Sequence, residues 1–257
     1  MGEPNRSEGL DALRGFAVVL MILFHLSYDL STPSFSLRIF HPSPSDWPKG
    51  YWVYFSDLIG VIFFSVVGLS VWMKQQSAVK AGDKTQSRSF FYRRGLRILA
   101  IAFALTLGTI FFQPSDVIYF GVLHCIGVSV LLLPFFFRLS RPVIFMLSLF
   151  MIVAGLVLRD RLFSFSWLFW LGFQPTAWLS GDWYPLLPWF GVALLGFYLG
   201  PIFLHNQQRS SQRNQQRSSF AAPRRFSVFL GQHSLMIYLI HQPVLWGVLT
   251  LLKKAGY

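Results

Sequence analysis

The sequence predicts an all-α fold: a polytopic membrane helix bundle of about seven transmembrane helices. Of the 257 residues, 54% are hydrophobic and only 12% are charged, and the mean hydropathy is +0.50. A soluble domain carries about 25% charged residues. The apolar residues also gather in runs close to the ~20 residues that a helix needs to cross a bilayer. We therefore expect an integral membrane protein, with the lipid bilayer as a partner and a single transmembrane domain over 1–257.

Seven runs are long and apolar enough to be predicted as spans. They cover 13–30, 51–73, 98–113, 118–137, 142–158, 186–204 and 226–252. A further aromatic-rich run, 162–179, is expected to lie in the outer interface or to re-enter the membrane. The reason is parity, since an eighth crossing would move the basic segment 205–225 to the opposite side from the other basic segments.

The basic residues predict the orientation. The chain has 22 Lys and Arg residues against 10 Asp and Glu, a formal net charge of +12. Most of the basic residues fall near the N-terminus and in 74–97, 138–141 and 205–225, which the seven spans place on one side. We expect that side, including the N-terminus and a flexible basic loop at 205–225, to be the cytoplasm of a bacterial inner membrane. No nucleic-acid partner is expected, because the basic residues share no surface with base-stacking aromatics.

Four ionisable side chains inside the predicted spans are the most informative feature of the chain. At 1.5 Å per residue, His25 and His241 lie about 18 and 22 Å from the inner boundary. Asp57 and His124 each lie ~9 Å below the outer boundary. In a core of ~30 Å these depths form one layer, about two-thirds of the way to the outside. Because ionisable groups are costly in a membrane, the shared depth indicates a functional site.

The histidines each have a structural alternative. Asp29 follows His25 at i+4, so its carboxylate could hold one imidazole nitrogen as N–H and leave the other as a base. Alternatively, Asp29 only ends the helix and His25 packs in it. His241 lies close to Pro243, where a role at a kink is the alternative. The candidate catalytic residues are His25, Asp29, His124 and His241.

Arginines at the predicted inner boundary indicate a second ligand. Arg14 opens the first span, and Arg93, Arg94 and Arg97 cluster at the foot of the third. Converging guanidiniums suit a phosphate-rich ligand, although basic residues here also serve orientation alone. No metal is expected, since no HxxxH or HExxH spacing occurs. The single cysteine, Cys125, excludes an intrachain disulfide.

Several strings together resemble one family. They are RSEGLDALRGFAVVLMILFHLSYDL, YFGVLHCIGVS, SGDWYPLLPWFGVALLGFYLG and GQHSLMIYLIHQPVL. In this order they are similar to the bacterial heparan-alpha-glucosaminide N-acetyltransferase catalytic-domain family, and the likeness extends from about Arg6 to Leu245. His25 falls in the first-helix motif and His124 in the fourth-helix motif. The loop histidine proposed for catalysis in the lysosomal members has its nearest counterpart here in His41.

The resemblance implies a transmembrane acyltransferase. Acetyl-CoA from the cytosol would be the acyl donor, its phosphates held by the arginines, and an amino sugar or glycan on the outer face would be the acceptor. Asp57, Asp182 and Trp183 are the residues expected to bind that acceptor. The alternatives are an O-acyltransferase of surface polysaccharide, a proton-coupled transporter that uses the buried His and Asp layer, and a lipid-binding scaffold. The sequence leaves a homo-oligomer open.

Overall fold

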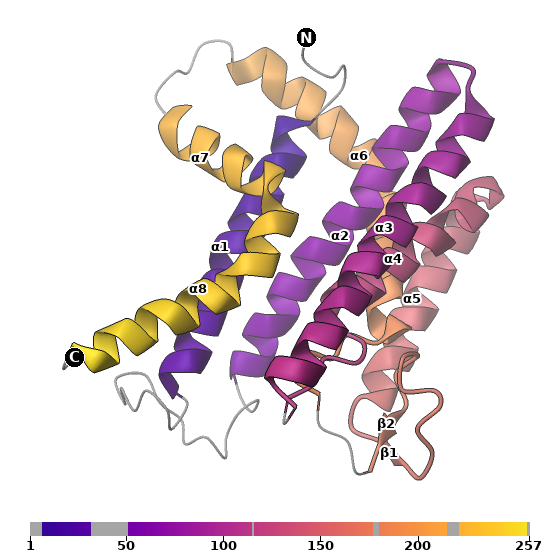
Figure 1. The fold of residues 1–257 in the computed structure, drawn as a ribbon. Coiled ribbons are helices and arrows are strands. Elements are labelled where there is room, and N and C mark those ends of the chain that lie inside the picture. The colour runs from indigo at the N-terminus through magenta and orange to yellow at the C-terminus, as the bar shows by residue number, and fades with distance from the viewer. Residues whose placement is uncertain (1–6, 32–50, 115, 177–179, 215–220, 256–257) are drawn as a thin grey trace. The chain divides into compact units, whose positions relative to one another are not determined.

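The computed structural model describes residues 7–31, 51–114, 116–176, 180–214 and 221–255 (Figure 1). Within them the elements are α1 (Glu8–Ser31), α2 (Tyr51–Lys80), α3 (Lys84–Phe112), α4 (Val122–Leu132), the 3-10 helix η3 (Leu133–Arg138), α5 (Arg141–Leu158), β1 (Leu162–Phe163), β2 (Gln174–Pro175), α6 (Leu186–Asn214), α7 (Ala221–Gln232) and α8 (Ser234–Lys254). Over this described part, six helices are long and apolar enough to cross a membrane, and Val122–Arg138 is a shorter apolar helix. The predicted all-α membrane bundle is confirmed.

The chain divides into two compact units. Unit 1 consists of Met1–Phe63 and Ser210–Tyr257, and unit 2 consists of Phe64–Arg209. Helix α2 passes from one unit into the other, so its two halves belong to different units. Each unit is described by itself below.

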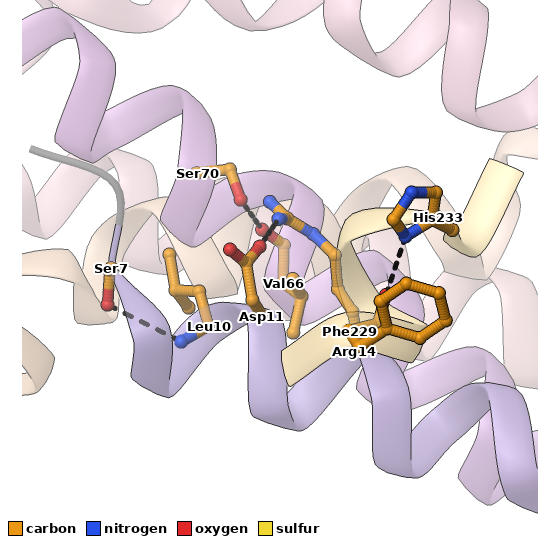
Figure 2. A network of polar contacts seen from close by, with 8 residues as sticks. All are labelled: Ser7, Leu10, Asp11, Arg14, Val66, Ser70, Phe229 and His233. Atoms are coloured by element: carbon orange, nitrogen blue, oxygen red, sulfur yellow. Dashed lines mark hydrogen bonds and ion pairs between the residues drawn. The ribbon is translucent and has the colours of Figure 1, made fainter. Parts of the chain in front are cut away.

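In unit 1, α1 begins where the sequence supplies a cap. The hydroxyl of Ser7 accepts a hydrogen bond from the backbone N–H of Leu10 at 3.4 Å, as Figure 2 shows. Glu8 and Asp11 lie in the first turn, where negative charge is favoured by the helix dipole. Helix α7 packs against this end of α1 (Figure 1). The contact is close because glycine lies on both sides of it: a Cβ on Gly15 would overlap the Ser227 carbonyl, and one on Gly231 would overlap the Asp11 carbonyl.

The predicted span 226–252 is confirmed only from Ser234 onward, because its first residues belong to a separate helix. α7 ends at Gln232 and α8 begins at Ser234, with His233 between them at φ −104°, ψ 14°. The chain changes direction there (Figure 1). Gly231, which weakens a helix, lies just before the break. The depth estimate for His241 changes with this correction, since His241 lies about 10 Å from the start of α8.

The predicted loop 205–225 is also different in the structure. Helix α6 continues through this segment as far as Asn214, and α7 begins at Ala221. Residues 215–220 lie outside the described part. The polar segment 74–97 is also largely helical, since α2 extends to Lys80 and α3 begins at Lys84. Polar composition marks where a helix leaves the membrane, and it does not by itself end the helix.

The run 162–179 forms no helix over its described residues, which confirms that it does not cross as one. β1 and β2 form a short parallel pair, and turns lie between them. Gly172 has a φ of +131°, which a residue with a side chain rarely adopts. Phe163 and Phe173 contact each other with ring centroids 4.9 Å apart. Non-helical backbone of this kind is expected at the interface or within protein, and not against lipid.

The core of unit 2 lies among α2, α3, α4, α5 and α6. Phe64, Trp189 and Tyr184 stack in it, with Phe64 and Trp189 centroids 5.4 Å apart. Helices α3 and α4 pack closely through Gly95 and Gly127, where a Cβ would collide with Leu131 and Leu99. Small residues at such contacts are typical of membrane helix pairs, since they let the backbones approach.

Candidate active site

Two histidine side chains from different helices meet in unit 1. His25 on α1 and His241 on α8 contact each other edge to face, with ring centroids 4.7 Å apart. His241 is only 8% exposed, and His25 is half-buried with the Phe24 ring beside it. The contact brings together two of the four side chains that the sequence predicted to share a layer. Two adjacent imidazoles inside a membrane protein are a candidate catalytic centre.

Backbone carbonyls set the proton position on both rings. Nδ1 of His25 lies 2.8 Å from the carbonyl oxygen of Met21, and Nδ1 of His241 lies 2.6 Å from that of Tyr238. A carbonyl oxygen can only accept, so each Nδ1 carries the hydrogen. In the neutral imidazole, Nε2 is then the basic nitrogen on both residues. The Nε2 atom of His241 is buried and has no hydrogen-bond partner among the residues that the structure describes.

Asp29 lies beside this pair but does not orient His25 in the predicted way. The Nδ1 atom of His25 is held by Met21, four residues earlier, and not by the carboxylate four residues later. Asp29 is 1% exposed, and Gln242 donates a hydrogen bond to its Oδ1 at 3.5 Å. Trp246 also hydrogen-bonds this carboxylate. Asp29 therefore links α1 to α8 at the residue that follows His241.

Gln242 is a residue of this centre that the sequence reasoning missed. Its Nε2 contacts Asp29, while its Oε1 is buried and has no partner within the described part of the chain. The available signal was an amide side chain inside an apolar span, directly after a histidine. Unsatisfied buried polar atoms are costly, so the Oε1 of Gln242 and the Nε2 of His241 are each suited to accept a hydrogen bond from a ligand.

In unit 2, His124 has the opposite arrangement. Its Nδ1 accepts from the backbone N–H of Gly121 at 3.3 Å, and its Nε2 lies 3.3 Å from the hydroxyl of Thr106. That hydroxyl donates to the carbonyl of Ile118 at 2.7 Å, so its oxygen accepts a hydrogen bond from the N–H at Nε2 of His124. The ring is 2% exposed and stacks on Phe120. Both nitrogens are engaged, and His124 closes the start of α4 as a cap.

Two residues predicted to bind the acceptor hold loops in place. The carboxylate of Asp182 accepts a hydrogen bond from the backbone N–H of Val122 at 3.0 Å, at the first residue of α4. The indole N–H of Trp183 donates to the carbonyl of Phe169 at 3.2 Å. Asp57 is half-buried on α2 in unit 1. The acceptor-binding roles of all three stay predictions. Asp182 and Trp183 also stabilise the local backbone through these hydrogen bonds.

The arginines differ in their surroundings. Arg14 pairs with the buried carboxylate of Asp11 at 2.6 Å, and Figure 2 shows its guanidinium directed at that side chain. Arg93, Arg94 and Arg97 are exposed on α3 in unit 2, where spacings of three and four residues put them on adjoining faces. Arg93 contacts the hydroxyl of Ser89 at 3.2 Å. The guanidiniums of Arg93, Arg94 and Arg97 are exposed, whereas that of Arg14 is paired with Asp11 on its own helix.

Within the described residues, no group of three or more His, Cys, Asp and Glu side chains is arranged to hold a metal ion. His41, the nearest counterpart of the family's loop histidine, lies outside the described residues.

A family model matches nearly the whole chain. Residues 6–243 match the family described as heparan-alpha-glucosaminide N-acetyltransferase, catalytic. The chain belongs to this family. Neither a curated protein nor a solved structure matches it significantly. As a member of the heparan-alpha-glucosaminide N-acetyltransferase family with six long apolar helices in its described part, it is an integral membrane protein and a membrane acetyltransferase. The family uses acetyl-CoA as its donor.

Proposed function

We propose that this chain transfers an acetyl group from cytosolic acetyl-CoA to an amino sugar or glycan on the outer face of a bacterial inner membrane. The observation that carries the proposal is the contact between His25 and His241, in which both Nε2 atoms are left as bases. Transfer to an amine requires a base at the reacting centre, and a neutral imidazole is suited to that role near neutral pH.

The proposed step is direct transfer. The nitrogen of the acceptor attacks the thioester carbonyl, so a C–N bond forms and the C–S bond breaks. Nε2 of one imidazole takes the proton that the attacking nitrogen loses, and the imidazolium returns it to the leaving thiolate of coenzyme A. His25, the more exposed of the two rings, is assigned to this proton transfer. His241 supports it from the buried side, and Asp29 with Gln242 holds α8 against α1.

The donor and its side of the membrane follow from charge. The exposed Arg93, Arg94 and Arg97 are proposed to bind the phosphates of coenzyme A, because guanidinium groups bind phosphate through paired hydrogen bonds. Arg14, paired with Asp11, is assigned to the phosphates as well, because it lies near the start of the first span. Basic residues mark the cytoplasmic side, so we place the N-terminus and the coenzyme there. Asp57, Asp182 and Trp183 remain candidates for the acceptor.

His124 is not assigned to the transfer. Its two nitrogens already serve Gly121 and Thr106, so it could accept a proton only by releasing the start of α4. We propose that His124 maintains the junction between α3 and α4 in unit 2.

The test measures transfer of labelled acetyl from acetyl-CoA to glucosamine by the full chain in vesicles. We expect His25→Ala to lower the rate about 10²- to 10⁴-fold, the contribution typical of a general base. His233→Ala is the matched control, since its Nδ1 is also held by a backbone carbonyl but its ring is exposed at the break between α7 and α8. Full activity of a correctly folded His25→Ala protein would overturn the assignment.

The acceptor is tested separately. Glucosamine and N-acetylglucosamine differ at the amine, so acetylation of both at equal rates would favour the O-acyltransferase. Movement of solute that depends on the proton gradient, without any consumption of acetyl-CoA, would favour the transporter. Either result would replace the proposed reaction.

A further inference from the structure

Helix α7 presents two different faces. Ser227 and Gly231, four residues apart, lie on the face that contacts α1. There the backbone of α7 approaches Gly15 and Asp11 so closely that a Cβ on either glycine would overlap a carbonyl oxygen. This face is packed against α1, so any other partner of α7 must contact its opposite face.

The other face of α7 is apolar and exposed. Phe226 is 61% exposed and Phe229 is 55% exposed, and their spacing of three residues places them side by side. The ring of His233 lies against Phe229, with centroids 4.4 Å apart, as Figure 2 also shows. Two neighbouring phenylalanines in water are unfavourable, because apolar surface gains free energy when it is removed from water.

The charges of α7 indicate what covers this face. Arg225 is exposed next to the phenylalanines, and the sequence of the helix contains Arg224 and Arg225 but no acidic residue. Only His233 separates α7 from α8, which is long and apolar enough to cross a membrane. Helix α7 therefore lies where a membrane span ends. A helix with aromatic residues on one face and arginine beside them is typical of a segment that lies in the interface of an anionic membrane.

We propose that α7 is an interfacial helix that binds anionic lipid. Phe226 and Phe229 enter the boundary between headgroups and acyl chains, and Arg225 contacts lipid phosphate. A second copy of the chain fits this face less well, because a two-fold interface would bring two copies of Arg225 together, and α7 itself has no acidic residue to pair with them. This inference is independent of the acetyl-transfer proposal.

The first test measures the surroundings of each phenylalanine. Spin labels are attached to Phe226→Cys and Phe229→Cys in a Cys125→Ala background, with the full chain in phosphatidylcholine vesicles that contain phosphatidylglycerol. We expect relaxation by dissolved oxygen to exceed relaxation by a water-soluble nickel chelate at both sites. Phe111→Cys, on the exposed face of the spanning helix α3, is the lipid control. Ala81→Cys, exposed in the turn between α2 and α3, is the water control.

The outcomes separate the alternatives. Labels that respond as at Ala81 would place this face in water and overturn the proposal. Labels shielded from both reagents would mean that protein covers the face, and would overturn it in favour of a second copy. The charge is tested by Arg225→Gln, which should lower the preference for vesicles with phosphatidylglycerol over pure phosphatidylcholine about fivefold, as expected for one arginine at an anionic surface. Equal label exposure with and without phosphatidylglycerol in labelled chains that retain Arg225 would contradict the anionic-lipid contact.

Discussion

The histidines of the two units differ in which ring nitrogen the backbone uses. In unit 1, backbone carbonyls accept hydrogen bonds from the Nδ1–H groups of His25 and His241, so Nε2 is the basic nitrogen of each ring. In unit 2, Nδ1 of His124 accepts a hydrogen bond from a backbone N–H, and its Nε2–H donates to the hydroxyl of Thr106. The same side chain is thus a proposed base in one place and a helix cap in the other. The hydrogen-bond partner, and not burial or depth, separates the two roles.

The largest effect is expected from removing the paired imidazoles of unit 1, of which His241 is the buried one. Because His241 contacts His25 and has an unpaired buried Nε2, its loss should lower acetyl transfer by about 10²-fold or more. The rates of His25→Ala, His241→Ala and the double variant are compared in vesicles. If the two rings act as one unit, the double variant should be scarcely slower than the single variants. Independent, multiplying effects would contradict the paired arrangement.

A smaller effect on a different quantity is expected at His124. His124→Ala leaves the N–H of Gly121 and the hydroxyl of Thr106 without their partner, which should cost about 1–3 kcal/mol of stability. Transfer per folded molecule should stay near that of the unchanged protein. Thermal unfolding in detergent and the rate of acetyl transfer are both measured.

His124→Gln is the matched variant for this prediction. A glutamine can accept from one backbone N–H and donate to Thr106, but it cannot act as a base near neutral pH. It should therefore recover stability and keep activity. A His124→Gln protein that is as stable as the original but inactive would return His124 to the catalytic residues and remove the contrast between the units.

Hydropathy predicted most of the fold, and its failures have physical reasons. The segment from Phe226 to Leu230 is apolar enough to read as part of a span, so the break at His233 was missed. Its exposed phenylalanines and its close contact with α1 through Gly231 are tertiary features. The six helices long enough to cross the membrane were found because a continuous apolar run is itself the signal.

The candidate site was less accessible to sequence reasoning. The contact of His25 with His241 follows from the packing of α1 on α8, which no spacing within one helix reveals. Spacing suggested Asp29 as the partner of His25, whereas the carbonyl of Met21, also one turn away, holds that nitrogen. The cap formed by His124 could have been predicted, since glycine at an N-cap with a polar side chain three residues later is a recognisable start of a helix.

The smallest expected effect compares two carboxylates of unit 2. Asp116 lies between α3 and α4 with its carboxyl against Gly181, and burial raises the pKa of Asp116. The folded protein therefore favours the neutral acid. This stability is fully present below the pKa of the unfolded chain, about 3.9, and is lost as the pH rises through the folded-state pKa.

Asp116→Asn should remove this pH dependence and raise the unfolding temperature slightly at neutral pH, without a change in acetyl transfer. Asp182→Asn is the contrasting variant, because the carboxylate of Asp182 accepts the N–H of Val122 at the positive end of α4, so its loss should lower stability. Unfolding is followed from acid to neutral pH in detergent. Equal changes in unfolding temperature for the two variants would mean that the hydrogen bond from Val122 does not distinguish Asp182 from Asp116. That result would also weaken the argument that hydrogen-bond partners separate the roles of the histidines.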